Sequence, residues 1–281
     1  MRKRSARKIQ KKKSFNLLKV IIPLVLLITI FLFWFFSPKH WNGKDKLSLV
    51  IGGGGDIKVS VFDPVNSEIT SFIIPADTQV TVAEGKGIFK IKNVWQLGID
   101  EHLGGKLLAE TVTNNFNFPV YLWKGEGKTN MSLVDSILLS FFKMSVKEVD
   151  KNEIDLGKSL YVKKQKLEDG EWGYVLNGTI PERLTVYFSD YTIAENTPRV
   201  LIEDATGKIG ISEKMGEIIE IMGGKIVSVQ KKPNNDTNCT IGGGKKEVVE
   251  KFATIFSCQK SKDQGEFDVT IKIGRAFAKR F

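Results

Sequence analysis

The stretch that decides the fold runs from residue 47 to residue 78 and reads LSLVIGGGGDIKVSVFDPVNSEITSFIIPADT. It opens with an apolar run, Leu47–Ile51, that is typical of a buried strand and leads into four glycines. Residues 57–62 and 68–74 also have strand character, and between them lies Asp63-Pro64-Val65-Asn66, a turn signal. This order predicts a meander of strands entering a β-sheet, and residues 77–82 continue with strand character.

Helical and extended patterns alternate over the next hundred residues. The expected elements are a helix over 101–116, a strand over 118–123, a helix from Asn130 or Ser132 to Met144, a strand at 159–162 in a polar loop, and a strand over 183–188. Gly104 and Gly105 weaken the first turn of the first of these helices. A domain boundary is expected at 194–198, where Ala-Glu-Asn-Thr-Pro interrupts the pattern.

A compact second unit of about 80 residues follows this boundary. Its expected elements are strands over 199–203, 225–230, 239–241 and 267–273, helices over 212–222 and 245–257, and a glycine loop over 205–210. Strands and helices alternate, which predicts a small α/β domain made of two βαβ-like halves. The fold class of the whole chain is therefore expected to be α/β.

The N-terminus is strongly basic and precedes an apolar run. Nine Lys and Arg residues occur before residue 20, and taking them from 42 leaves 33 basic against 32 acidic residues. The net charge of +10 therefore belongs to the tail, and nucleic acid is not an expected partner of the folded region.

Val20–Phe36 is uncharged and spans roughly 25 Å as a helix. We expect a cytoplasmic tail (1–16), a transmembrane helix (17–36) in the lipid bilayer of the cell membrane, and a spacer (37–46) that leads to extracytoplasmic domains.

A cleaved signal peptide is the alternative interpretation of this segment. Signal peptides have shorter apolar cores and end in small residues, as in Ala-x-Ala. Here residues 33–40 read Phe-Trp-Phe-Phe-Ser-Pro-Lys-His instead. An uncleaved, single-pass anchor is therefore the favoured interpretation.

The sequence contains two cysteines, Cys239 and Cys258, both in the region expected outside the cytoplasm. An even pair in an oxidising compartment predicts a disulfide, with two free thiols as the alternative. The strand after Cys239 and the helix that returns before Cys258 cover comparable distances, ~13 and ~20 Å, so the two residues can meet. Closing this loop of roughly 20 residues would contribute on the order of 3 kcal/mol.

Motifs of common enzymes are weak in this chain. His40 and His102 have no second histidine or cysteine at metal-ligand spacing, so zinc and Ser-His-Asp chemistry are not expected. Residues 242–246 resemble the end of a phosphate-binding loop, but Cys239 and Lys246 stand where that motif needs Gly and Ser or Thr. A strand-to-helix turn is the favoured interpretation there. Gly52–Gly55 is compatible with an anion-binding nest, although a flexible hairpin link is favoured.

The order of several short motifs resembles the LytR–CpsA–Psr (LCP) family. The residues that carry the resemblance are Asp63-Pro64, then Ile73-Ile74-Pro75-Ala76-Asp77-Thr78 where the family has Ser-Ile-Pro-Arg-Asp-Thr, then Ile91-Lys92-Asn93, and then Leu133-Val134-Asp135. Residues 200–230 are in turn similar to the LytR C-terminal domain. The resemblance spans residues 47–281 and rests on the order and spacing of these motifs.

The resemblance implies an activity whose key residues this sequence lacks. LCP enzymes transfer glycopolymers from a polyprenyl-pyrophosphate carrier to peptidoglycan, using arginines to neutralise the pyrophosphate and carboxylates to hold magnesium or act as base. The family's arginine is Ala76 here, and its upstream Arg-x-Asp falls on Gly53–Gly55, with Asp56 one residue out of register. Lysine does not replace a bidentate arginine without loss. The residues that remain as ligand-binding candidates are Asp56, Asp77, Lys92 and Asn93.

These observations predict an LCP-like α/β/α mixed-sheet domain over 47–195 and a LytR C-terminal-like domain over 198–281. The expected function is a binding or scaffolding module of the cell envelope, without catalytic residues, metal or cofactor. By resemblance, its ligand would be a polyprenyl lipid or a cell-wall polymer, in an apolar cavity whose mouth gathers Asp77, Lys92 and Gly52–Gly55. The alternative is a divergent LCP-type glycopolymer transferase, which would use Asp77 and need magnesium.

Overall fold

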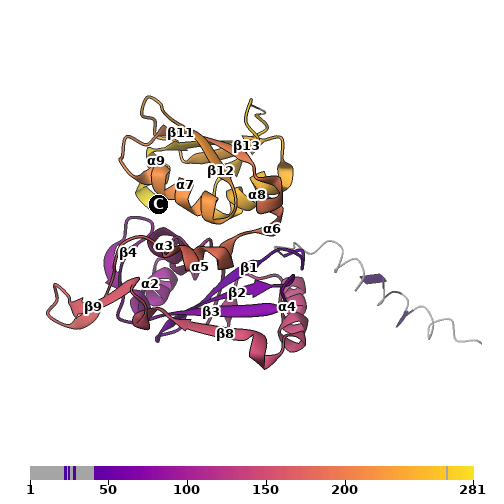
Figure 1. Cartoon of the computed structure of the whole chain (residues 1–281), viewed down its shortest axis with the longest axis vertical. Helices are drawn as coiled ribbons and strands as arrows, with labels where there is room; N and C mark the ends of the chain where they lie inside the picture. Colours follow the sequence, from indigo (N-terminus) through magenta and orange to yellow (C-terminus); the bar gives the residue numbers. More distant parts are fainter. Residues whose placement is uncertain (1–21, 24, 26–27, 30–40, 264) are drawn as a thin grey trace, which may run out of the picture.

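A computed structural model describes residues 22–23, 25, 28–29, 41–263 and 265–281. They form two α/β bodies, one over residues 41–190 and one over residues 191–281 (Figure 1). The α/β fold class predicted from the sequence is confirmed. The predicted tail and most of the predicted anchor lie outside the described residues, although residues 22, 23, 25, 28 and 29 are helical. None of the helices among the described residues combines the length and the apolar character needed to cross a bilayer.

The first body is built on a mixed sheet that contains the predicted meander. The strands, in spatial order, are β7 (Lys128–Thr129), β6 (Leu122–Gly125), β1 (Leu47–Ile51), β2 (Ile57–Asp63), β3 (Glu68–Ile74) and β8 (Lys151–Asp155). Strands β1, β2 and β3 are antiparallel, whereas β6 runs parallel to β1 and β8 parallel to β3. The Asp63 carboxylate accepts the backbone N–H groups of Val65 and Asn66, which closes the predicted turn.

Helices cover both faces of this sheet, as the prediction of an α/β/α domain requires. Alternate residues of β1 show the two faces: Val50 packs in one apolar core, and Leu47 and Leu49 pack in another. The first core is covered by α2 (Val94–Asp100) and α3 (Lys106–Phe116). The second core is covered by α4 (Leu133–Ser145), which Ser132 caps as predicted by accepting the Asp135 N–H.

Several local predictions for the first body are wrong. The helix expected over 101–116 begins at Lys106, because Gly104 takes a positive φ of 58° and separates α3 from the preceding α2. The strand expected over 183–188 is instead α5 (Glu182–Thr185) followed by η4 (Val186–Phe188). Its buried side chains, Leu184 and Phe188, are four residues apart, which is a helical spacing.

Two small hairpins were not predicted, although strand character was expected over 77–82, where β4 (Gln79–Val82) lies. The hairpins consist of β4 with β5 (Gly87–Lys90), and of β9 (Val162–Lys166) with β10 (Trp172–Leu176). The strand expected over 159–162 begins only at Val162, the first residue of β9. The polar composition of this segment concealed its strands because most side chains of β9 are exposed.

The second body follows its prediction closely. Its sheet has the order β12 (Lys225–Lys231), β11 (Arg199–Ala205), β15 (Val269–Gly274), β13 (Cys239–Gly243) and β14 (Gln259–Lys260). Helix α7 (Ile211–Ile221) connects the parallel strands β11 and β12, as a βαβ unit does. The second half departs from this pattern because β15 is antiparallel to β13. Helix α9 (Arg275–Arg280), which was not predicted, ends the chain before Phe281.

The predicted disulfide is present between Cys239 and Cys258, whose Cα atoms are 5.0 Å apart. Cys239 begins β13, and Cys258 follows α8 (Lys246–Ile255), which runs back along that strand. The bond therefore joins the two ends of the strand–helix unit.

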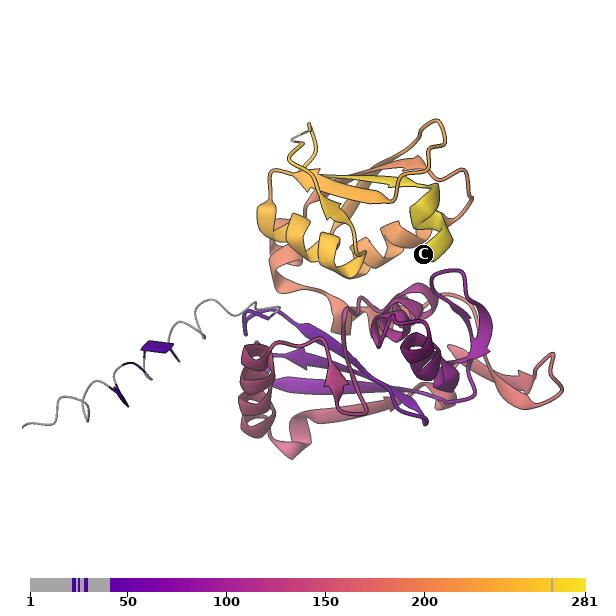
Figure 2. The ribbon, with the colours of Figure 1, turned by 180° about the vertical axis from the view of Figure 1, so that it is seen from behind.

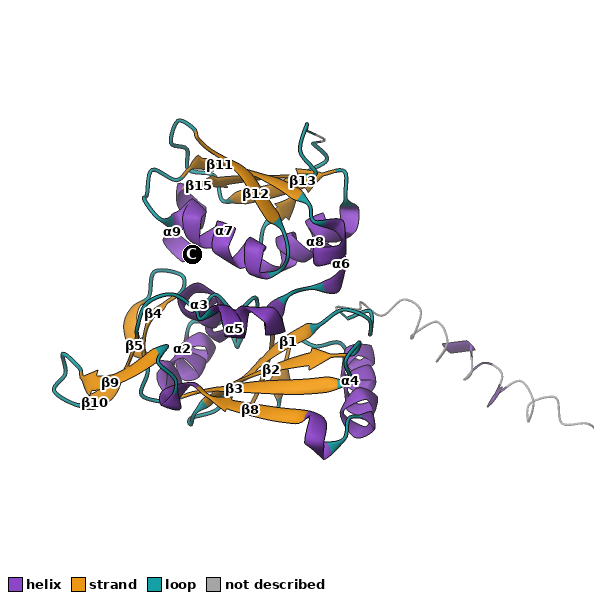
Figure 3. Ribbon diagram, in the orientation of Figure 1, coloured by secondary structure: helices purple, strands orange, loops and turns teal. Residues whose placement is uncertain are grey.

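The helices of the second body face the first body (Figures 2 and 3). Direct hydrogen bonds join the two bodies: the Glu84 N–H donates to the Arg280 carbonyl at 2.8 Å, and the Asn114 amide donates to the Phe281 carbonyl at 2.7 Å. Helix α6 (Tyr191–Asn196) connects the bodies, and its Ile193 packs in the core of the second one. The domain limits of 195 and 198 remain a prediction.

Candidate functional site

The candidate residues from the LCP resemblance meet around Ala76, at the turn after β3. Asp56 Oδ1 accepts the Ala76 N–H at 2.8 Å, and the Ala76 carbonyl accepts the Lys92 N–H at 3.1 Å. Lys92 Nζ lies 2.6 Å from Asp77 Oδ1. We call Asp56, Ala76, Asp77 and Lys92 the Ala76 corner. Asn93 lies next to it as the exposed residue before α2, where its side chain makes no capping hydrogen bond.

The chemistry of the Ala76 corner differs from that of a pyrophosphate site. Its described side chains include two carboxylates and one ammonium group, so the corner has a net negative charge. The sequence has no arginine between residues 47 and 182, and bidentate arginine is the usual partner of such an anion. The carboxylates do not converge on one point either, since Asp56 accepts a backbone N–H and Asp77 pairs with Lys92. Such a donor set does not fit a magnesium ion.

The interior next to the glycine loop is filled by the indole of Trp95. This side chain is 1% exposed and packs edge-on against Trp123, with ring centroids 5.8 Å apart. Gly52, Gly105 and Gly125 surround it so closely that a Cβ at any of them would lie 2.6 to 3.0 Å from an indole atom. The indole of Trp95 therefore occupies the space directly behind Gly52, where part of the apolar cavity was expected. Within the described chain, the indole Nε1 has no hydrogen-bond partner.

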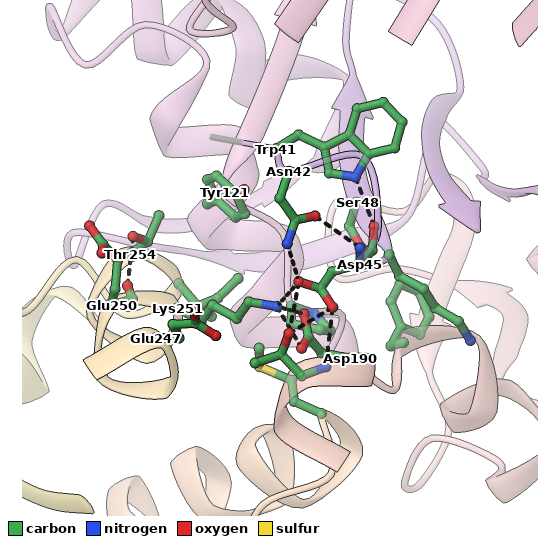
Figure 4. A pocket seen from close by; sticks show the side chains of 16 residues that line it. Trp41, Asn42, Asp45, Ser48, Tyr121, Asp190, Glu247, Glu250, Lys251 and Thr254 are labelled. Atoms are coloured by element: carbon green, nitrogen blue, oxygen red, sulfur yellow. Dashed lines mark hydrogen bonds and ion pairs between the residues drawn. The ribbon is translucent and has the colours of Figure 1, made fainter. Parts of the chain in front are cut away.

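A cavity of about 410 Å³ lies elsewhere, at the junction of the two bodies (Figure 4). Its walls come from the start of the described chain, the end of the first body, α6 and α8. The residues that line it are Trp41, Asn42, Asp45, Lys46, Ser48, Pro119, Tyr121, Phe188, Asp190, Thr192, Met222, Glu247, Glu250, Lys251, Thr254 and Ile255. Sequence analysis did not identify this site.

Lys251 on α8 connects segments that are far apart in the sequence. Its Nζ lies 2.7 Å from Asp45 Oδ2 and 2.5 Å from Asp190 Oδ2 (Figure 4). Asp45 also accepts the N–H of Thr192 at 3.1 Å, and Asp190 accepts the N–H of Ile193 at 3.0 Å as the cap of α6. We call Asp45, Asp190 and Lys251 the junction clamp, because they hold the start of the described chain, α6 and the second body together.

The two carboxyl groups of the junction clamp respond differently to burial. Burial raises the pKa of a carboxyl group by disfavouring its charged form. At Asp45, hydrogen bonds from Lys251, Asn42 and Thr192 outweigh burial, and the pKa is lowered. At Asp190, burial prevails over the attraction of Lys251, and the pKa is raised. Lys251 neutralises part of the negative charge of Asp45 and Asp190. We therefore assign the junction clamp a structural role.

Only part of the junction clamp left a signal in the sequence. Asp45 is the first acidic residue of the chain, and Asp190 stands three residues before an apolar position, as an N-cap does. Lys251 is one of 42 basic residues, and nothing in its local pattern distinguishes it.

Comparisons with known proteins gave matches among solved structures alone. No model of a protein family matches the chain, and no curated protein does. The transcriptional regulator yvhJ from Bacillus subtilis is 11% identical, with a TM-score of 0.38 over 48% of this chain and 91% of that one. TagT bound to LIIa-WTA is 15% identical, with a TM-score of 0.39 over 50% of this chain and 88% of that one.

A further structure found is the LytR-CPS2A-psr family protein YwtF (TagT) with bound octaprenyl pyrophosphate lipid. It is 11% identical, with a TM-score of 0.26 over 78% of this chain and 93% of that one. The structures found thus include a member of the family that the sequence motifs resemble.

Proposed function

We propose that this chain is a single-pass membrane protein of the cell envelope whose extracytoplasmic region is an LCP-like binding or scaffolding module without transferase activity. The order of its motifs and its α/β/α layers support the LCP-like part. The apolar run over 17–36 and the preceding positive charges support the anchor and its orientation. The Cys239–Cys258 disulfide supports an oxidising compartment outside the cytoplasm. The second body is proposed to be the LytR C-terminal-like domain.

The proposal rests on the negative charge of the Ala76 corner and on the filled interior behind Gly52. A polyprenyl pyrophosphate needs a cationic site for its head and an apolar channel for its tail. At the Ala76 corner the single lysine is already paired with Asp77, and Trp95 occupies the interior behind Gly52. Both features oppose binding of the lipid carrier. What remains is an anchored pair of bodies, joined by direct hydrogen bonds, that can hold a partner or a wall polymer.

Binding of octaprenyl pyrophosphate to the full chain in detergent tests this proposal directly. We expect no binding to the wild-type protein. Ala76→Arg restores a cation at the corner, so it should give measurable binding of inorganic pyrophosphate in calorimetry. The matched control is Thr81→Arg, which adds the same charge at an exposed position of β4 outside the corner. Tight binding of the lipid by the wild-type chain would contradict the proposal.

The divergent transferase is the second candidate, and the retained Asp77 favours it. Asp77 and Lys92 keep side chains that are 42% and 38% exposed, so a substrate could reach them. This alternative predicts transfer of a lipid-linked glycopolymer that requires magnesium and is lost in Asp77→Ala. Equal transfer by wild type and Asp77→Ala would remove Asp77 from that role, and no transfer by either would favour the scaffold.

A further inference from the structure

Helix α4 has two apolar faces, and only one of them packs against the sheet. The other face carries Leu133, Ile137, Phe141 and Met144, which we call the α4 stripe. These positions recur every three or four residues and lie within about 80° of one another around the helix axis. Leu133, Phe141 and Met144 are 59%, 68% and 82% exposed. A contiguous exposed apolar surface of this kind marks an interaction site.

Positive charge borders the α4 stripe. Lys143 and Lys147 lie at its edge, and burial together with the nearby charge of Lys124 lowers the pKa of Lys143. Among the described residues, neither Lys124 nor Lys143 is paired with a carboxylate. The neighbouring Glu148 is bonded to Lys151. The Lys143 ammonium group lies 5.0 Å from the centre of the Phe62 ring and is not neutralised by a carboxylate among the described residues. Apolar side chains beside such lysines match the boundary between acyl chains and anionic lipid headgroups.

The start of the described chain attaches α4 next to the proposed anchor. The Trp41 N–H donates to Asp135 Oδ1 at 3.2 Å, and its ring packs edge-on against Phe142 at 5.8 Å. The apolar run ends at Phe36, and the five residues from there to Trp41 can reach at most about 18 Å. Figure 1 shows α4 along the edge of the first body, beside the point where the continuous coloured ribbon of that body begins. The stripe itself is about 16 Å long, so it lies within reach of the same membrane surface.

We propose that α4 lies on the outer surface of the bilayer, with the α4 stripe inserted at the acyl-chain boundary and Lys143 and Lys147 at the headgroup phosphates. This inference rests on the anchoring proposed above. It adds a fixed orientation: the first body meets the membrane through α4, and the glycine loop between β11 and α7 faces the aqueous phase.

Spin labelling of the full chain in vesicles of phosphatidylcholine and phosphatidylglycerol tests this orientation. Both native cysteines are in the disulfide, so an introduced cysteine is the only thiol to label. The labelled variants are Met144→Cys on the stripe, Ile209→Cys at a 99% exposed residue in a loop of the second body, and Val25→Cys within the proposed anchor. We expect labels at 144 and 25 to collide several-fold more with oxygen than with a water-soluble nickel complex, and the label at 209 to show the reverse.

Each other outcome has a distinct meaning. A lipid-exposed label at 25 with a water-exposed label at 144 overturns the α4 proposal and leaves the anchor intact. A water-exposed label at 25 overturns the anchor, and with it the proposed topology. A label at 144 that is shielded from both reagents shows that protein covers the stripe, which also overturns docking to lipid.

A charge placed on the stripe gives a second measurement. Phe141→Glu, combined with Met144→Cys, should raise the collision of the label with the nickel complex several-fold because a carboxylate is expelled from the acyl-chain boundary. Leu160→Glu is the matched control: it introduces the same charge at an exposed leucine outside α4 and should leave the label unchanged. Equal collision rates in both variants would contradict insertion of the stripe.

Discussion

The Ala76 corner and the junction clamp use the same two residue types in different surroundings. Lys92 lies 2.6 Å from Asp77, and Lys251 lies 2.7 Å from Asp45 and 2.5 Å from Asp190. The Asp77 side chain is 42% exposed, whereas those of Asp45 and Asp190 are 8% and 11% exposed. Water screens the first pair and hardly reaches the second group. The contribution of such an ion pair to stability therefore depends on its burial, and not on the residue types alone.

This difference separates the two regions by role. The Ala76 corner is the place to which the family resemblance points, yet it consists of a screened ion pair over a filled interior. The junction clamp carries no family signature, yet it links both bodies and the segment that leads to the proposed anchor. The predictions below rank the regions by the free energy of unfolding of the full chain in detergent, measured with urea and circular dichroism.

Trp95→Ala should have the largest effect, a loss of about 4 kcal/mol, because it removes a buried indole from between Gly52, Gly105 and Gly125 and leaves a cavity. The control is Trp172→Ala, since that indole is 66% exposed and its removal should change stability by about 0.5 kcal/mol or less. Similar losses of stability in both variants would mean that the interior behind Gly52 is not tightly packed.

Lys251→Met should cost about 3 kcal/mol, because Asp45 and Asp190 would be left buried without their cation. Lys260→Met removes a lysine from an exposed pair with Glu250 in the same body and serves as the control. If Lys251→Met lost no more stability than Lys260→Met, the junction clamp would not hold the bodies together.

Asp204→Asn extends the comparison to a buried pair inside the second body. The Asp204 side chain is fully buried; burial raises its pKa, but hydrogen bonds from Lys231, Thr206 and Ser212 outweigh this and lower the pKa to about 2. A carboxyl group with a lowered folded-state pKa stabilises the fold above its ordinary pKa, 3.8, and loses this contribution as the pH falls towards 2.

The Asp204→Asn protein should therefore be about 2 kcal/mol less stable at pH 7, with a smaller difference from wild type at each step between pH 4 and pH 2. Unfolding curves across this pH range measure the effect. Asp263→Asn is the control: hydrogen bonds from Ser261 and Lys272 lower the pKa of Asp263 in the same direction, but its side chain is 69% exposed, so the same pH dependence should be smaller. A constant difference across the range would assign the effect of Asp204 to packing alone.

Lys92→Met should have the smallest effect, at most about 1 kcal/mol, because its pair with Asp77 is exposed to water. A loss as large as that of Lys251→Met would reverse the ranking of the two regions. It would also show that the Ala76 corner contributes substantially to the stability of the first body.

Local sequence patterns predicted the structure correctly where nearby residues decide the conformation of a segment. The meander over 47–74, the Ser132 cap and the strands of the second body follow from alternation, capping and turn chemistry within a few residues. Predictions failed where a partner distant in the sequence decides the conformation. Strand β8 is polar and becomes a strand because it pairs with β3. Residues 183–188 form helical turns that bury Leu184 and Phe188 in the core of the first body.

The amino-acid sequence by itself determined the α/β class, the opening meander, the pair of cysteines that bond and the residues that meet at the Ala76 corner. These depend on side-chain periodicity and on residues joined by short connections. Tertiary structure alone decided that Trp95 fills the interior, that α4 keeps an apolar face outside the core, and that Asp45, Asp190 and Lys251 meet. The physical reason is that burial depends on segments brought together from about 200 residues apart, and burial sets both the cost of a cavity and the strength of a charge pair.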